Sequence, residues 1–258
     1  MKSFLLMKGD CLQKMSKIED HSVDLILCDL PYGTTACAWD SILDTTELWA
    51  HYERLVKPQG AIVLTASQPF TTALIQSKIE WFKYEWIWEK TRATGHAHSK
   101  NKPLKKHENI LVFSPGTTVH ASQSKDRMNY YPQGLRHCAK IQKRKGKQSS
   151  AIFSARDSHK EEYIQDKTGY PASILRFASE MSTEHPTQKP VSLMAYLIRT
   201  YTQPREVVLD NCMGSGTTGV AALAEKRKFI GTEKDPKYYE VAVRRIKEAD
   251  KLSKSRLF

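Results

Sequence analysis

The sequence predicts an α/β protein built on a doubly wound, mostly parallel sheet, with a basic insertion in its second half. Two observations carry this prediction: short apolar runs alternate with stretches of helical spacing, and one region breaks the alternation. The chain has 258 residues, 40% of them apolar, which suffices for one α/β domain with an inserted region. We therefore expect three parts in chain order, at residues 1–113, 114–184 and 185–258.

The first part contains strands separated by helices. Strands are expected at residues 4–7, 23–28, 61–66, 84–88 and 110–113. The second of them, VDLILC, is a continuous apolar run, which is typical of a strand covered on both faces. Helices are expected at 44–57, ended by Pro58 to Gly60, and at 68–78.

The last part repeats this style, and the middle part does not. Val191, Met194, Ile198 and Tyr201 fall on one face of a predicted helix. It is followed by a strand at 207–209, a helix at 217–226, a strand at 229–232, and a last helix that Asp235-Pro236 caps and that runs towards Lys251. The region 114–184 is polar, and its basic residues outnumber its acidic ones. We interpret it as an insertion that projects from the sheet.

A glycine turn in the last part has the pattern of a cofactor site. Gly214-Ser215-Gly216 joins the strand at 207–209 to a helix, and glycines let the backbone turn tightly and approach a ligand. Glu233 ends the next strand, where a carboxylate can accept hydrogen bonds from the ribose hydroxyls of an adenosine-containing cofactor. A phosphate-binding P-loop needs a lysine after the last glycine. Thr217 stands there instead, so an NTPase is disfavoured.

A second motif, Asp29-Leu30-Pro31-Tyr32-Gly33, directly follows the strand at 23–28, and ligands bind where parallel strands end. An exocyclic amine on a nucleic-acid base is a poor nucleophile. Asp29 and the Leu30 carbonyl can accept its hydrogens and localise its lone pair. Pro31 fixes the backbone there, and Tyr32 can stack on a base that has left the duplex. The simpler interpretation is a strand-end turn, for which Asp, Pro and Gly are common residues.

Together the two motifs resemble the amino-methyltransferases of DNA, whose catalytic signature is Asp, Asn or Ser, then any residue, then Pro and an aromatic residue. The catalytic motif precedes the glycine motif, an order similar to the permuted beta group of that family. The segment 185–190, HPTQKP, is similar to the one before the family's cofactor-flanking helix, and Gly9-Asp10 matches its adenine-contacting position. The resemblance covers nearly the whole chain. It implies a Rossmann-like fold and S-adenosylmethionine as the cofactor.

The resemblance also implies a role for each motif residue. The catalytic pocket would be formed by Asp29, Leu30, Pro31 and Tyr32. The cofactor would be bound by Asp10 at its adenine, Glu233 at its ribose, Asp210, Met213, Gly214, Ser215, Gly216, Thr217 and Thr218 at its methionine end, and Lys189 nearby. Two residues depart from the family pattern. Asn211-Cys212 stand where it often has Pro-Phe, which predicts a looser contact with the cofactor, and Leu30 replaces the commoner first proline.

The net charge of +12, from 40 Lys and Arg against 28 Asp and Glu, favours a polyanionic partner, although a merely soluble basic protein has the same composition. The resemblance makes that partner double-stranded DNA, because the basic stretch lies where the beta group carries its target-recognition domain. The candidate DNA contacts are Lys140, Lys143, Arg144, Lys145 and Lys147. Beta-group enzymes are often dimers, so a homodimer is also expected.

Metal sites, membrane segments and disulfides are not expected. The positive sulfonium of the cofactor drives methyl transfer without a metal, and the histidines at 96, 98 and 107 lack a known zinc spacing. Five cysteines without a CxxC pair favour a reduced, cytoplasmic compartment. The apolar run at 4–7 is too short for a signal peptide, and no run approaches the length that crosses a bilayer.

The sequence leaves the methylated base open. Asp29 favours adenine N6, because in this family a serine at that position is commoner among cytosine-N4 enzymes. A cytosine-N4 DNA methyltransferase and an RNA amino-methyltransferase are the alternatives that keep the chemistry. A catalytically inactive nucleic-acid binder is the alternative that loses it, and the intact Asp29, Pro31 and Tyr32 argue against it.

Overall fold

The structure is a computed structural model that describes residues 3–33, 43–120, 124–143, 162–180 and 188–255. Its contacts divide the chain into a large unit, residues 1–131 and 173–258, and a small unit, residues 132–172. The small unit is narrower than the insertion expected at 114–184, because residues on both sides of it belong to the large unit.

The large unit is built on an eight-stranded sheet with the order β1-β10-β9-β2-β3-β5-β4-β8. Its strands are β1 (Phe4–Lys8), β2 (Val23–Asp29), β3 (Val56–Ala66), β4 (Phe82–Thr94), β5 (Lys105–Phe113), β8 (Ile174–Phe177), β9 (Val207–Asp210) and β10 (Lys228–Glu233). All neighbours pair in parallel except β5, which is antiparallel to both β3 and β4. The mostly parallel sheet confirms the predicted fold class.

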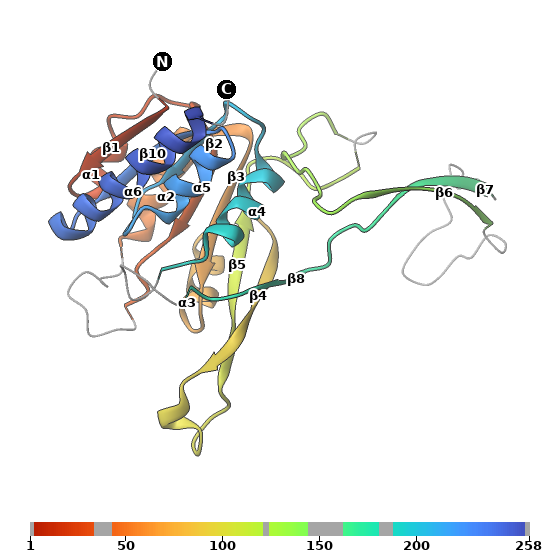
Figure 1. Ribbon diagram of the computed structural model, residues 1–258, viewed down its shortest axis with the longest axis horizontal. Helices are drawn as coiled ribbons and strands as arrows, with labels where there is room; N and C mark the ends of the chain where they lie inside the picture. The colour runs from red at the N-terminus through yellow and green to blue at the C-terminus, as the bar shows by residue number, and fades with distance from the viewer. Residues whose placement is uncertain (1–2, 34–42, 121–123, 144–161, 181–187, 256–258) are drawn as a thin grey trace. The chain divides into compact units, whose positions relative to one another are not determined.

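Helices cover both faces of this sheet (Figure 1). One face carries α1 (Cys11–Met15), α2 (Thr45–Leu55) and α3 (Phe70–Ser77), and the other carries α4 (Val191–Tyr201), α5 (Thr217–Ala224) and α6 (Pro236–Ser255). Strand β2 lies between the layers: Leu25 and Leu27 pack into one core cluster, and Ile26 and Cys28 into the other. Because side chains alternate along a strand, its continuous apolar run is explained by burial on both faces.

Side-chain caps fix where several helices begin. The carboxylate of Asp235 accepts from the backbone N–H groups of Lys237 and Tyr238, as the predicted cap of the last helix requires. Asp44 caps α2 in the same way. The sequence did not predict α1, a helix of five residues that Asp10 caps immediately after β1. No described helix has both the length and the apolar character that crossing a membrane requires.

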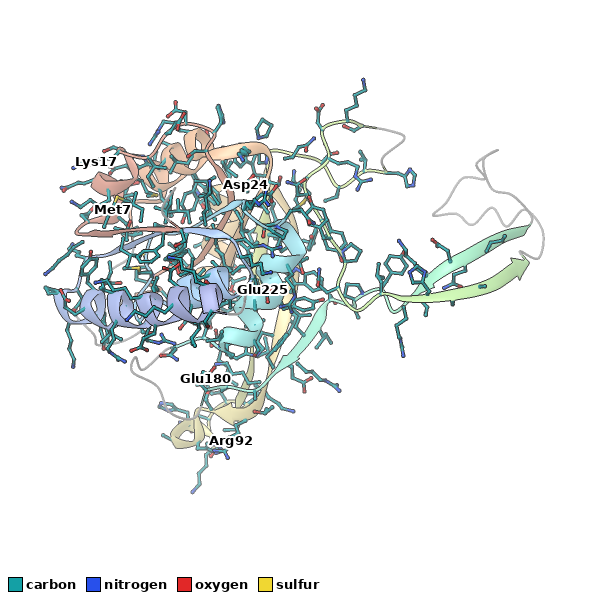
Figure 2. The ribbon with its side chains drawn as sticks, turned by 45° about the horizontal axis from the view of Figure 1, so that its top comes forward. Met7, Lys17, Asp24, Arg92, Glu180 and Glu225 are labelled. Carbon is teal, nitrogen blue, oxygen red and sulfur yellow. The ribbon has the colours of Figure 1, made fainter. Side chains whose placement is uncertain are left out.

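Strands β4 and β5 extend beyond the expected ranges and form a hairpin that projects from the sheet, with a short 3-10 helix, η1 (His96–His98), near its tip (Figure 1). We call residues 90–107 the basic hairpin. They include no acidic residue and six basic ones, Lys90, Arg92, Lys100, Lys102, Lys105 and Lys106. Arg92 lies on the far part of this hairpin (Figure 2).

The small unit contains a two-stranded antiparallel sheet of β6 (Arg136–Lys143) and β7 (Glu162–Thr168). Strand β8 follows it and pairs in parallel with β4, so the expected insertion at 114–184 includes a strand of the main sheet. The sequence missed β8 because it has only four residues and lies on the edge of the sheet.

Candidate active site

Both sequence motifs lie at the carboxyl ends of neighbouring strands. Asp29 ends β2 and Asp210 ends β9, and these strands pair in parallel through Leu25 with Val208 and Ile26 with Leu209. The chain leaves β9 for β10 on one side and β2 for β3 on the other, so the two ends flank the point where the winding of the sheet reverses. Ligands of doubly wound sheets bind at that point.

The carboxylate of Asp29 is held by side chains from three separate segments. Its Oδ1 accepts a hydrogen bond from the Tyr32 hydroxyl at 2.7 Å and another from the hydroxyl of Thr65 on β3. Its Oδ2 accepts one from the Lys189 ammonium at 2.5 Å. Asp29 keeps a partly exposed side chain, 26% accessible, and the other predicted pocket residues, Leu30 and Pro31, follow it directly.

Tyr32 lines the cavity, and its ring is already stacked on one neighbour. The ring stacks on Phe70 with centroids 5.2 Å apart, and its hydroxyl oxygen, whose hydrogen is donated to Asp29, lies 3.0 Å from the hydroxyl oxygen of Thr65. Burial and the nearby charge of Asp29 raise the pKa of the Tyr32 hydroxyl well above its usual value, so it stays a donor at neutral pH. Stacking of a substrate base on Tyr32 remains a prediction.

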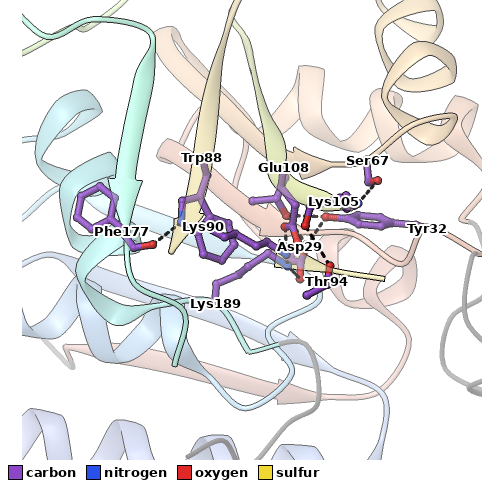
Figure 3. A network of polar contacts seen from close by, with 11 residues as sticks. Asp29, Tyr32, Ser67, Trp88, Lys90, Thr94, Lys105, Glu108, Phe177 and Lys189 are labelled. Atoms are coloured by element: carbon purple, nitrogen blue, oxygen red, sulfur yellow. Dashed lines mark hydrogen bonds and ion pairs between the residues drawn. The ribbon is translucent and has the colours of Figure 1, made fainter. Parts of the chain in front are cut away.

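Lys189 belongs to a buried chain of alternating charges (Figure 3). Its Nζ lies 3.5 Å from Oε2 of Glu108, whose Oε1 accepts from Lys90. Burial lowers the pKa of Lys189, but the carboxylates of Asp29 and Glu108 outweigh it, and the net shift is upward. Burial raises the pKa of Glu108, and Lys189 and Lys90 bring it below its usual value. Lys189 and Glu108 are therefore both charged at neutral pH.

The glycine turn is held mainly by backbone groups. The Gly214 N–H donates to Oε2 of Glu233 at 2.8 Å, and the Gly216 N–H donates to the Met213 carbonyl at 2.7 Å. Gly216 has a φ of +79°, and a Cβ there would lie 2.9 Å from Cδ1 of Ile246 on α6. Glycine is required here both by the backbone and by the close approach of α6.

Glu233 and Asp10 make local contacts besides their expected roles. Oε1 of Glu233 accepts from the Asp235 N–H, and Oδ1 of Asp10 accepts from the Leu12 and Gln13 N–H groups as the cap of α1. Each carboxylate has further lone pairs, and both side chains line the same cavity. Their predicted contacts with ribose and adenine stay predictions.

Asp210 is buried behind the turn. Its Oδ1 accepts from the Cys212 N–H, and burial raises the pKa of its carboxyl to about 7. Asn211, the departure from the family pattern, is also buried, and its amide oxygen accepts from the Tyr52 hydroxyl on α2 at 2.7 Å. The asparagine therefore ties the turn to the opposite helical layer.

One cavity of about 640 Å³ joins the two motifs. Residues of both motifs line this cavity, and its volume is in the range of small-molecule sites. The predicted residues among its lining are Asp10, Asp29, Leu30, Pro31, Tyr32, Lys189, Asp210, Met213, Gly214, Ser215, Thr217, Thr218 and Glu233. Within the described part of the chain, no three His, Cys, Asp or Glu side chains are grouped as metal ligands.

Several site residues were missed by the sequence analysis. Glu108, Lys90 and Trp88 line the cavity from the β4–β5 hairpin, and Arg245 on α6 donates to the Ser215 carbonyl and hydroxyl. The sequence signal that was available is Glu108 itself, an acidic residue two positions before the apolar run ILVF. The other three give no local pattern, because their roles depend on tertiary contacts.

The predicted DNA contacts lie at the limit of the described chain. Lys140 and Lys143 are part of β6, whose side chains at these positions are not described, and Arg144, Lys145 and Lys147 lie outside the described residues. The basic hairpin is described instead, and its Thr94 and Lys90 line the cavity. A basic surface thus adjoins the candidate active site.

Comparison with known proteins decides the family. A family model described as DNA methylase, N6_N4_Mtase, matches residues 23–244, and that range includes both motifs. The chain belongs to this family. The match confirms the resemblance, so this chain is a DNA methyltransferase of the amino-methylating type.

Two curated relatives agree with this assignment. This chain is 28% identical to the type II methyltransferase M.HinfI of Haemophilus influenzae. The alignment of 269 residues covers 94% of this chain and 68% of the relative. It is 29% identical over 269 residues to the DNA adenine methyltransferase YhdJ of Escherichia coli strain K12, covering 98% and 85%.

Solved structures show the same fold. The complex of M1.HpyAVI with SAM has a TM-score of 0.61 at 23% identity, covering 94% of this chain and 99% of that chain. The cytosine-N4-specific PvuII DNA methyltransferase has a TM-score of 0.64 at 15% identity, covering 98% and 93%. At these identities the likeness supports the fold of this chain and leaves its target base open.

Proposed function

We propose that this protein transfers a methyl group from S-adenosylmethionine to N6 of an adenine that has left double-stranded DNA. One observation carries the proposal: the Asp29 carboxylate and the glycine turn open into a single cavity, although 181 positions separate Asp29 from Asp210 in the chain. A methyl donor in the turn and a base amine at Asp29 would therefore meet without a change of fold.

The lining of the cavity fits the cofactor. Carboxylates outnumber lysines around it, which suits a ligand that carries a sulfonium and an ammonium group. Glu233 and Asp10 line the cavity and have lone pairs for ribose hydroxyls and an adenine amine. Asp210 lines it as well, and its carboxylate would attract the ammonium group of the cofactor. When bound, the cofactor supplies an electrophilic methyl group, so the protein has only to position and desolvate the reactants.

At the catalytic end, Asp29 and the Leu30 carbonyl accept the two hydrogens of the base amine. These hydrogen bonds localise its lone pair and aim it at the methyl donor. Pro31 holds the carbonyl in place through its fixed φ. After transfer the amine nitrogen carries a positive charge and is acidic, so its proton leaves to Asp29 or to water without a separate general base.

The basic hairpin supports DNA as the substrate. Apart from Lys90, its basic side chains are exposed, and phosphate contacts by such side chains supply most sequence-independent affinity. We also propose that the region 114–184, including Lys140, Lys143, Arg144, Lys145 and Lys147, reads the target. A homodimer and a cytoplasmic location are further proposals. The second follows from the DNA substrate and from free thiols at Cys11 and Cys28.

The test is an analysis of the product. The protein is incubated with S-adenosylmethionine and unmethylated DNA, and the digested nucleosides are identified by mass spectrometry. N6-methyladenine is expected, and it should vanish in Asp29→Ala but not in Asp20→Ala, a matched change to a carboxylate that pairs with Arg54 outside the cavity. N4-methylcytosine would overturn the base assignment. Methylated RNA with unmodified DNA, or bound cofactor without any product, would overturn the proposed substrate or the activity.

A further inference from the structure

Lys90, Glu108 and Lys189, which form a chain of alternating charges that ends at Asp29, have no role in the mechanism proposed above. Accessible fractions are 8% for the Lys189 side chain, 11% for Glu108 and 14% for Lys90. Removing charges from water is unfavourable by several kcal/mol for each ion, and only close opposite charges offset it. Replacing a buried ion pair by apolar side chains is often neutral or stabilising, so the stability of the fold is not by itself a reason for these charges beside Asp29.

The contacts of Asp29 suggest what Lys189 does. A carboxylate has about four acceptor sites. Among the described residues, Tyr32 and Thr65 donate to Oδ1, and Lys189 donates to Oδ2. One acceptor site is therefore left, on Oδ2, and its direction is set by where the Lys189 ammonium lies. A base amine would be received at that site.

Glu108 holds Lys189 in turn. Its Oε2 faces Lys189 at 3.5 Å and has no hydrogen-bond partner among the described residues, whereas its Oε1 is occupied by Lys90. Oε2 of Glu108 thus faces the Lys189 ammonium, although Lys90 and Lys105 also act on the same carboxylate. Loss of Glu108 would leave Lys189 with Asp29 alone.

The neighbour of Lys189 contacts the glycine turn. Oε1 of Gln188 accepts from the Ser215 hydroxyl at 3.1 Å, and Arg245 donates to the same hydroxyl at 2.9 Å. Residues 188 and 189 therefore touch both motifs. A cofactor that orders the turn would also steady the backbone that carries Lys189.

We propose that Lys189 is a positioning residue that directs the free acceptor site of Asp29 towards the base amine, and that Glu108 holds Lys189 in place and charged. This deepens the proposed function and rests on it, because it takes Asp29 as the residue that receives the amine. The proposal assigns Lys189 to the catalytic end of the cavity. The sequence analysis, by contrast, expected Lys189 near the cofactor.

The activity test compares Lys189→Met, Lys189→Arg and Glu108→Gln. In Lys189→Met, kcat should fall on the order of 100-fold, as for a reactant displaced by about 1 Å, with little change in the dissociation constant of S-adenosylmethionine. Lys189→Arg keeps the charge and should restore part of kcat. Lys78→Met is the matched control, since Lys78 is also a partly buried lysine between two carboxylates, Glu53 and Glu80, outside the cavity.

A pH profile separates this role from a structural one. The charged or titratable groups that face Lys189 are Asp29 on β2, Tyr32 after it, Lys90 on β4, and Lys105 and Glu108 on β5. In Glu108→Gln, the pKa of Lys189 should fall, because the carboxylate that opposes the effects of burial and of the neighbouring lysines Lys90 and Lys105 is lost. The alkaline limit of kcat should then move to lower pH by about 1 to 3 units. Adding Lys189→Arg should abolish the move, because a guanidinium stays charged.

Two results would overturn the proposal: an unmoved alkaline limit in Glu108→Gln, or a Lys189→Met enzyme that loses cofactor affinity and keeps its kcat. If the wild-type protein methylates nothing, the proposed function fails, and the arrangement is tested directly. In a lysine NMR titration, the resonance that disappears in Lys189→Met should titrate at lower pH in Glu108→Gln than in the wild type. An unchanged titration would refute the role given to Glu108.

Discussion

The two ends of the cavity are built by different means. At the catalytic end, Asp29 is held by the side chains of Tyr32, Thr65 and Lys189. At the cofactor end, the turn is closed largely by backbone N–H groups, such as that of Gly216 on the Met213 carbonyl. The cofactor end should therefore be sensitive to changes of backbone conformation, and the catalytic end to the loss of single polar atoms.

The largest effect is expected from Gly216→Ala. Its left-handed φ and its contact with Ile246 should together destabilise the fold by about 2 to 5 kcal/mol and abolish cofactor binding. Thermal unfolding and calorimetric titration measure both. Gly95→Ala is the control, since Gly95 has a φ of +91° with nothing within 4 Å of an added Cβ. Equal losses in the two variants would show that the approach of α6 is unimportant.

Thr65→Val should have the next largest effect, and at the catalytic end. A hydrogen bond to a charged group contributes about 1.5 to 3 kcal/mol, so kcat should fall about 10- to 100-fold while the fold and cofactor affinity are kept. Steady-state methylation measures it. Thr72→Val, which removes only a hydroxyl bonded to Gln68 at an exposed position, should change nothing. A weaker cofactor affinity in Thr65→Val would contradict the separation of the two ends.

Asp210→Asn should change how cofactor binding depends on pH. The pKa of Asp210 is about 7, and a cationic ligand binds best to its ionised form. Binding of S-adenosylmethionine should therefore tighten as pH rises, about tenfold between pH 6 and pH 8. Titration calorimetry should show this for the wild type and a flatter dependence for Asp210→Asn, in which only the ligand titrates. Parallel curves for the two proteins would exclude Asp210 as the titrating group.

The smallest effect is expected from Lys100→Gln with Lys102→Gln on the basic hairpin. Each phosphate contact contributes about 0.9 to the salt dependence, so the slope of log affinity against log salt should fall by about 1.8. Binding to a DNA duplex at several salt concentrations measures it. A pair of exposed lysines outside the hairpin, Lys17 and Lys251, provides the control. An unchanged slope would remove the hairpin tip from the DNA interface.

The sequence indicated the local geometry of the glycine turn better than the contacts around Asp29, for a physical reason. The turn, its strand and Glu233 lie close together in the chain, so their spacing shows the local geometry. Lys189 contacts Asp29 from 160 positions away, and Glu108, 79 positions from Asp29, contacts Lys189. These contacts depend on the pairing of strands and on the docking of α4. No short-range pattern records such contacts, and Lys189 could be placed in the site only by resemblance.

The fold shows the same division. Long apolar strands such as β2 were predicted because burial on both faces leaves a continuous pattern. Helix α1 was missed because five residues span little more than one helical turn, and its cap, Asp10, matched a cofactor position as well. Strand β8 was missed because pairing with β4, rather than its own composition, makes it a strand.

One contact described by the structure bears on the order of the motifs. The Ser3 hydroxyl donates to Oδ1 of Asp250 at 2.5 Å, so β1 and α6 bring together positions 247 apart in the chain. The first and last elements of the large unit therefore lie next to each other. The pairing of β2 with β9 does not depend on which of the two motifs comes first in the chain. In a circularly permuted protein, a linker would join Ser3 to Asp250 and the new termini would lie between residues 180 and 188. The glycine motif would then come first in the chain. The same cavity would form from a chain of the opposite motif order.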